Sequence, residues 1–413
     1  MKVRFALLVK PADEGSFRAY CQRRKLSLPK KTLLQQYCIL HSKYFSRIVE
    51  RGQHIDYHSN ELVPYQQIHV DGFPKTGSFG RVDKAYAPSQ PHTVLARKEI
   101  FANYDKSELD KRIQKEVETL KKLDHPHLLR LWGTYTHRRT FFILLQPFAN
   151  QSLKDILYQK DMVVPGNLLL NWILDLFSAL TYLHDQDIIH RDLKPENILV
   201  EGDLVYIGDF GLSKISETAT DETATVSGTE LYKAPEQQSG GHYGRKADVF
   251  SMACVVVDLL ALGNNISKPH FNQFLAQHGP KTCHRSNHMC FRHNLGVVRF
   301  VLSNIEHNNG LGKLCDTVQY DLLQEEPRYR PSALDALKSL QRSLGLRKGF
   351  KKLPCCHLDG VTKYEDASVK SLTKKLDALS IKGGVAEGRT ESMEEGFQKL
   401  LSERGASKTV FSC

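Results

Sequence analysis

The chain has 413 residues, of which 41% are hydrophobic and 25% are charged, the balance of an ordinary globular protein with a sizeable core. No apolar run approaches the roughly 18 residues that span a bilayer, and the apolar stretch at residues 5–9 is shorter than the roughly 7–15-residue core of a secretion signal. The nine cysteines are odd in number and scattered, which is typical of free thiols. We therefore expect a cytoplasmic or nuclear protein without a transmembrane segment.

The formal net charge of +11 is carried by the two ends of the sequence. Residues 1–66 hold 12 Lys/Arg against 5 Asp/Glu, and residues 345–413 hold 13 against 9, so the middle of the chain is balanced. Solvated extensions are the simpler interpretation, and attraction to acidic partners or anionic membrane is the alternative. Because no aromatic residues interleave the charges regularly, we expect no nucleic-acid partner.

Helical periodicity appears first at residues 33–49, within a basic N-terminal extension that we place at 1–66. Short strands are then predicted at 68–73, 80–87, 93–100 and 140–148, where β-forming residues are separated by turn residues. Helices are predicted at 107–123, 167–184, 247–262 and 332–344. Strands followed by helices predict an α+β fold with two packed lobes, a small β-rich one and a larger, mainly helical one.

The domain boundaries follow from these changes in composition and in the predicted elements. We expect one two-lobed domain at 67–344, with an N-lobe at 67–146 and a C-lobe at 149–344. After residue 345 the sequence becomes polar, which predicts a flexible C-terminal tail at 345–413.

Two polar clusters directly follow apolar segments. The sequence HRDLKPEN at 190–197 contains Asp192, Lys194 and Asn197, and GDFG at 208–211 contains Asp209. Loops held by a rigid scaffold are where catalytic groups tend to lie. A carboxylate and an amide suit Mg²⁺, and a second carboxylate can accept a hydroxyl proton.

A glycine-rich loop, GFPKTGSFGRV, occupies residues 72–82. Glycines let backbone amides approach phosphates closely, although such loops are often only hairpin turns. The phosphate-binding loop G-x-x-x-x-G-K-[ST] is excluded, because Ser78 and Phe79 stand where Lys and Ser/Thr are required.

Taken in order, these motifs resemble the eukaryotic protein kinase family, serine/threonine branch, over roughly residues 68–343. The glycine-rich loop matches with Lys75 in place of the first glycine. Residues 95–98 match the strand of the ATP-gripping lysine, and 209–211 match the metal-binding triplet. The remaining matches are Glu116, residues 190–197, Gly228-Thr229, Ala234-Pro235-Glu236 and Arg330.

The resemblance implies ATP and Mg²⁺ as cofactors and protein substrates as partners. It implies that Lys98 grips the α- and β-phosphates and that Glu116 holds Lys98, although a plain surface salt bridge is the alternative for this pair. The other implied roles are Asp192 as the residue that orients and deprotonates the substrate hydroxyl, Lys194 as the cation at the γ-phosphate, and Asn197 and Asp209 as metal ligands. The implied ATP-binding residues are Lys75, Gly77, Ser78, Gly80, Val82, Ala96, Lys98, Phe148 and Leu199, and ordinary core packing is the alternative for the apolar ones.

Lys194 and Thr229 match the serine/threonine branch rather than the tyrosine branch. In the activation segment Thr223, Thr225 and Ser227 are candidate phosphosites, with Thr225 favoured, and the alternative is a loop that needs no phosphate.

Two other functions compete with an active protein kinase. A pseudokinase acting as a scaffold would usually lack the equivalents of Lys98, Asp192 or Asp209, all of which are present. A small-molecule kinase would generally lack the segment at 228–236.

Two further features of the sequence are not explained by the resemblance to protein kinases. The Cys/His cluster at 283–293 has its cysteines seven apart, which departs from the tight pairs of zinc sites. The basic run beside Cys355 and Cys356, at 347–356, would permit reversible acylation and peripheral membrane contact, although ordinary tail chemistry is the favoured interpretation.

Overall fold

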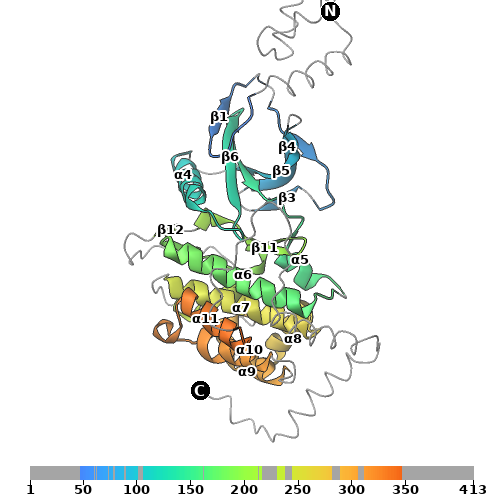
Figure 1. The fold of residues 1–413 in the computed structure, drawn as a ribbon, viewed down its shortest axis with the longest axis vertical. Helices are drawn as coiled ribbons and strands as arrows, with labels where there is room; N and C mark the ends of the chain where they lie inside the picture. The colour runs from blue at the N-terminus through green and yellow to red at the C-terminus, as the bar shows by residue number, and fades with distance from the viewer. Residues whose placement is uncertain are drawn as a thin grey trace, which may run out of the picture. The chain divides into compact units, whose positions relative to one another are not determined.

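The computed structural model describes residues 47–346, apart from 60, 62, 73, 78–79, 88–89, 101–105, 161, 213, 216–229, 238–243, 281–288 and 306–310. The chain divides into two compact units. The first, rich in β-structure, runs to Gln151 and includes Leu199–Gly202 and Tyr206–Ile215, and the second, mainly helical, holds the rest (Figure 1). The predicted α+β fold is confirmed.

A seven-stranded sheet forms the β-rich unit. Its strands are β1 (His54–Tyr57), β2 (Gln66–Ile68), β3 (Lys75–Gly77), β4 (Gly80–Ala87), β5 (Gln90–Ile100), β6 (Arg130–His137) and β7 (Thr140–Gln146). The order is β1-β6-β7-β5-β4-β2, with β3 paired to β4. From Asp83 onward β4 alternates buried and partly buried side chains, the period-2 pattern of a strand with one face on the core. Helix α4 (Lys106–Lys122) buries Ile113, Val117 and Leu120, which share one helical face.

The sheet extends N-terminally of residue 67, where the sequence predicted the start of the domain. β1 pairs in parallel with β6. Val49, Tyr57 and Tyr65 are buried in one core cluster with residues of β4 to β7. Most of the helical region predicted at 33–49 lies outside the described residues, and residues 47–49 are not helical.

Gly133 in β6 lets the N-terminal segment pass close to the sheet. A Cβ atom at this position would lie 2.3 Å from Val49 Cγ1 and 2.8 Å from the carbonyl oxygen of Gln53. The neighbouring Trp132 donates its indole N–H to the carbonyl of Val49 at 3.0 Å. The segment is therefore fixed to β6 by both packing and hydrogen bonding.

The helical unit is built around α7 (Arg245–Gly263), which is buried on all sides from Ala247 to Leu262. A helix that is apolar all round belongs at the centre of a domain. Helices α6 (Gly166–Asp185), α8 (Lys268–His278) and α11 (Ala333–Ser343) pack against it. The unit also contains α5 (Leu153–Tyr158), α9 (Leu295–Asn304), α10 (Gly312–Asp316) and the π-helix Thr317–Leu322.

The remaining strands of the described residues are short: β8 (Gln151–Ser152), β9 (Ile188–Ile189), β10 (Ile198–Glu201), β11 (Leu204–Ile207) and β12 (Lys214–Ile215). Within the described residues no single helix has the length and apolarity to cross a membrane. Only α7 and α8 taken together, with a 113° bend between them, meet that criterion by length and composition.

We predict that Gly133→Ala lowers the free energy of unfolding by about 1–3 kcal/mol, because the added methyl group overlaps Val49 and the Gln53 carbonyl. Gly296→Ala in α9 is the control, since a methyl group there meets nothing within 4 Å and alanine favours a helix. Urea unfolding followed by circular dichroism measures both variants. An unchanged midpoint for Gly133→Ala would contradict the close packing of the N-terminal segment on β6.

Candidate active site

In the β-rich unit Lys98 on β5 lies between two carboxylates. Its Nζ atom is 2.8 Å from Glu116 Oε1 on α4 and 3.3 Å from Asp209 Oδ1, which follows β11. The side chains of Lys98 and Glu116 are 14% and 10% exposed, whereas that of Asp209 is 47% exposed. Three segments far apart in the sequence thus bring one cation and two anions together, with one carboxylate open to solvent.

The charge of Lys98 is maintained by these neighbours. Burial alone would lower the pKa of its ammonium group, but the carboxylates of Glu116 and Asp209 outweigh burial and raise the pKa above its ordinary value. Lys98 is therefore a partly desolvated cation, which is the kind of group that attracts phosphate oxygens.

The backbone after β11 bends sharply to place Asp209. Asp209 has a φ of 58°, in the left-handed region that few residues other than glycine adopt. The next turn, Phe210–Leu212, packs against α4, and Phe210 is 1% exposed. A Cβ at Gly211 would lie 3.4 Å from Asp209 Oδ1 and 3.7 Å from Glu116 Oε2, so the triplet passes close to both carboxylates.

Strand register determines where the expected adenine-contacting residues lie. Lys98 is aligned with Val82 on β4 and with Ile143 on β7. Ala96 and Phe148 are buried, and Lys84 Nζ lies 4.9 Å from the centre of the Phe148 ring. Val82 and Leu199 are only partly buried. All four belong to the β-rich unit, and the two partly buried ones retain surface for a ligand.

The glycine-rich loop forms a hairpin between β3 and β4, with Lys75 opposite Val82 and Gly77 opposite Gly80. Lys75 is exposed, and Ser78 lies outside the described residues. A Cβ at Gly80 would lie 2.1 Å from the carbonyl oxygen of Glu99, so this glycine is required by the close approach of β4 to β5. Gly80 therefore has a packing reason that does not depend on a nucleotide.

In the helical unit Asp192, Lys194 and Asn197 form a second cluster. Lys194 Nζ lies 2.7 Å from Asp192 Oδ2, and Asn197 Nδ2 donates to the same oxygen at 3.0 Å. Asn197 Nδ2 also donates to the backbone carbonyl of Asp192 at 2.7 Å. The short 3₁₀ turn Pro195–Asn197 folds the loop back on itself, so that three residues close in sequence meet at one carboxylate.

Asp248, which the sequence motifs did not single out, holds this loop in place. It lies in the first turn of α7, is 2% exposed, and accepts the backbone N–H of His190 at 2.8 Å and of Arg191 at 2.9 Å. Its Oδ2 is also 3.0 Å from His184 Nε2. These bonds fix Arg191 at a φ of 71°, which is unfavourable for a bulky side chain.

The electrostatics of Asp248 fit this structural role. Burial alone would raise its pKa, but the hydrogen bond from His184, the nearby histidine rings and the Arg191 N–H outweigh burial and lower it. The sequence offered no clear signal for Asp248, because Arg245 and Lys246 also stand at the start of this helix and Asp258 lies inside it.

An ion pair joins the fully buried Arg330 to Glu236, whose side chain is 14% exposed. Arg330 Nη1 and Nη2 contact the two Glu236 oxygens at 2.6 and 2.7 Å, in the bidentate geometry of strong arginine–carboxylate pairs. The guanidinium also donates to backbone carbonyls of Gln324 and Glu325 and lies 5.0 Å from the centre of the Phe250 ring. The pair fixes the Ala-Pro-Glu motif. The candidate phosphosites Thr223, Thr225 and Ser227, and also Thr229, lie outside the described residues.

The other cysteine and histidine predictions are only partly within the described residues. Of the cluster at 283–293, Cys290 is buried, and His293 accepts a hydrogen bond from Arg292 Nε at 3.1 Å. Cys283, His284 and His288 lie outside, as does the segment 347–356. Where side chains are described, no three His, Cys, Asp or Glu are grouped to hold a metal ion.

Comparison with known proteins identifies the family of the segment that contains these clusters. Residues 76–340 match the protein kinase domain family. The human serine/threonine-protein kinase Nek11 is 26% identical over 270 residues, which cover 64% of this chain and 38% of that protein. Mouse Nek11 is 26% identical over 338 residues, covering 79% of this chain and 50% of that protein. The calcium/calmodulin-dependent protein kinase type 1 of Macrobrachium nipponense is 33% identical over 189 residues, 45% of this chain and 54% of that protein.

This chain spans between 38% and 54% of the length of these relatives. The family match takes in more than half of the chain and contains both side-chain clusters described above. The chain therefore belongs to the protein kinase family.

Proposed function

We propose that this chain is an active serine/threonine protein kinase, which transfers the γ-phosphoryl group of ATP to hydroxyl groups of protein substrates. The observation that carries the proposal is Lys98 held between Glu116 and Asp209. A pseudokinase acting as a scaffold would usually lack the equivalents of Lys98, Asp192 or Asp209, all of which are present. We place the catalytic domain at 67–344, with the segment from Val49 to Tyr65 completing its sheet.

Lys98 would bind the α- and β-phosphates of ATP, since phosphoryl transfer depends mainly on positioning and on charge neutralisation. Glu116 fixes the direction of the ammonium group. Asp209, whose carboxylate lies 3.3 Å from Lys98 Nζ, would hold a divalent cation that supplies further charge neutralisation for the phosphates.

The donor set suits Mg²⁺. Asn197 uses its Nδ2 for both hydrogen bonds to Asp192, which leaves the amide oxygen for another partner. Asp209 is half exposed and offers carboxylate oxygens. Amide and carboxylate oxygens are the ligands that Mg²⁺ takes, and the ion would neutralise the phosphate charge.

Asp192 would orient the substrate hydroxyl and accept its proton. Its carboxylate is held by Lys194 and Asn197, so its direction is set before a substrate arrives. Lys194 Nζ lies 2.7 Å from Asp192 Oδ2. Its positive charge would stabilise the phosphoryl group as it is transferred.

The choice of serine and threonine over tyrosine is supported by Lys194 and Thr229, which match that branch of the family. The named relatives Nek11 are also serine/threonine kinases. Thr223, Thr225 and Ser227 are the proposed phosphosites of the activation segment, with Thr225 favoured.

We predict that Lys98→Met and Asp192→Asn each reduce phosphoryl transfer at least about a hundredfold, a rise of about 3 kcal/mol in the barrier, because each removes a group that acts on the reacting phosphate or hydroxyl. Labelled ATP and a generic basic protein substrate measure the rate. Lys121→Met in α4 and Asp185→Asn at the end of α6 are matched controls, since both side chains are exposed and away from the two clusters. Equal rates in parent and active-site variants would refute the assignments.

Asn197→Ala should raise the Mg²⁺ concentration needed for half-maximal activity, because it removes one proposed metal ligand. It also frees Asp192 from two hydrogen bonds, so the maximal rate at saturating Mg²⁺ should fall as well. A titration of activity against Mg²⁺ separates the two effects. An unchanged titration midpoint would remove Asn197 from the metal site.

A further inference from the structure

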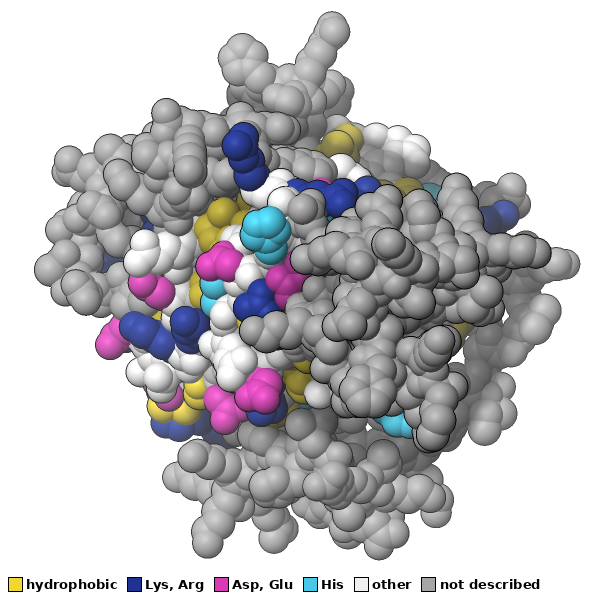
Figure 2. Space-filling model, turned by 90° about the horizontal axis from the view of Figure 1, so that it is seen from above, with side chains coloured by type: hydrophobic (Ala, Val, Ile, Leu, Met, Phe, Trp, Pro, Cys, Tyr) yellow, Lys and Arg dark blue, Asp and Glu magenta, His cyan; other side chains and the backbone are white. Residues whose placement is uncertain are grey.

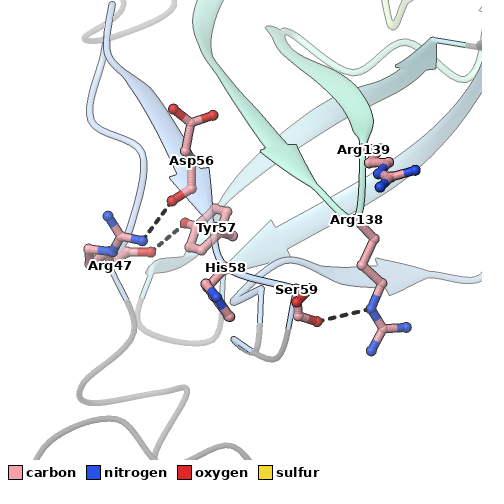
Figure 3. A pocket seen from close by; sticks show the side chains of 7 residues that line it. All are labelled: Arg47, Asp56, Tyr57, His58, Ser59, Arg138 and Arg139. Atoms are coloured by element: carbon pink, nitrogen blue, oxygen red, sulfur yellow. Dashed lines mark hydrogen bonds between the residues drawn. The ribbon is translucent and has the colours of Figure 1, made fainter.

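A second site is suggested by an open cavity of about 430 Å³ in the β-rich unit, where β1 ends beside the turn between β6 and β7 (Figure 3). Its lining residues are Arg47, Asp56, Tyr57, His58, Ser59, Arg138 and Arg139. None of them belongs to the candidate active site. Five of the seven precede residue 76, where the family match begins, so the cavity exists because the N-terminal segment docks on the sheet.

The turn that forms one wall of the cavity contains residues that are unfavourable for its backbone conformation. His137 pairs with Thr140, so Arg138 and Arg139 are the two central residues of the hairpin, with φ angles of 49° and 66°. Turns with two positive φ angles strongly favour Asn-Gly, and two adjacent arginines are unfavourable both sterically and by charge repulsion. Local rules broken in this way are typical of functional sites.

Two of the three lining arginines are held by backbone carbonyls, and the charge of Arg47 is already compensated by Glu61, which its Nε and Nη2 both contact. Arg138 Nε donates to the Ser59 carbonyl at 3.2 Å. On the opposite side Arg47 Nη2 donates to the Asp56 carbonyl at 2.8 Å and pairs with Glu61. Among the described residues Arg139, which is exposed, has no hydrogen bond or ion pair.

The acidic residue in the lining is directed elsewhere. The carboxylate of Asp56 accepts a hydrogen bond from Thr136 and lies 3.2 Å from His54 Nε2. Figure 3 shows it pointing away from Arg138 and Arg139. The cationic groups among the lining residues are those of Arg47, Arg138 and Arg139, and the ring of His58 lies with them.

We propose that this cavity binds a dianionic phosphate monoester, as carried by a phosphorylated serine or threonine side chain. A monoester offers three terminal oxygens and nearly two negative charges, which the guanidinium groups of Arg138 and Arg139 can share in charge-assisted hydrogen bonds. A phosphodiester offers one charge and two oxygens. Figure 2 shows basic and acidic side chains interspersed over the described part of the face seen from above.

Arg138→Asn together with Arg139→Gly is the decisive variant, because it installs the favoured turn residues while removing two cations. In the full-length chain we expect its thermal unfolding midpoint to rise and its affinity for a fluorescent phosphoserine peptide to fall at least about tenfold. Arg51→Gln is the matched control, since Arg51 is exposed in the same N-terminal segment and does not line the cavity. Lys98→Met should keep full binding, which separates this site from the nucleotide site and from the proposed catalytic function.

Fluorescence anisotropy with the phosphopeptide, its unphosphorylated twin and inorganic phosphate as competitor provides the measurement. Preferential binding of the phosphopeptide, lost in the double variant and kept in both others, supports the site. Competition by inorganic phosphate would identify the phosphate group alone as the ligand, and failure to compete would show that the peptide contributes. Equal binding of the twin peptides, undiminished binding by the double variant, or no saturable binding up to about 1 mM would each overturn the proposal.

Discussion

The interaction on which the β-rich unit depends is the contact of one lysine with two carboxylates. Lys98, Glu116 and Asp209 come from a strand, a helix and a sharp turn that are distant in the sequence. A partly buried charge is costly unless it is paired, and removing one partner leaves the other uncompensated. The three segments are therefore coupled, and a displacement of any of them changes the position of the ammonium group that would grip ATP.

In the helical unit two buried charged residues likewise hold distant segments in place by hydrogen bonds. Asp248, buried at the start of α7, holds the backbone of His190 and Arg191 and so determines where Asp192 lies. Arg330, also buried, holds Glu236 by two parallel bonds. Apolar packing supplies the stability of these helices, but it is non-directional. The directions of the proposed catalytic groups come instead from hydrogen bonds to buried charges.

Much of this could be predicted because the motifs are contiguous and the helices are long. The helix predicted at 107–123 is α4 at Lys106–Lys122, and that at 247–262 is α7 at Arg245–Gly263. The strands predicted at 80–87 and 93–100 are β4 and part of β5. The pairing of Lys98 with Glu116 followed from the family resemblance, and no property of the two residues alone separated it from a surface salt bridge.

What escaped prediction depends on contacts between distant residues. The strand β1 has four residues, too few for a periodic signal. The segment that leads into it lies close to β6 because Gly133 has no side chain. Asp248 acts through backbone N–H groups, which leave no trace in sequence. The turn at Arg138 and Arg139 has φ angles that composition argues against, so only the structure reveals it.

The central claim is that Lys98 and Glu116 act as one unit, and a double-mutant cycle on kcat/KM tests it most directly. The four forms are the parent, Lys98→Met, Glu116→Gln and the double variant, with Glu118→Gln, an exposed glutamate on the same helix, as control. If Glu116 works by holding Lys98, the double variant loses about as much activity as Lys98→Met alone. If the two losses multiply, each residue acts independently, and the claim that they form one unit is contradicted.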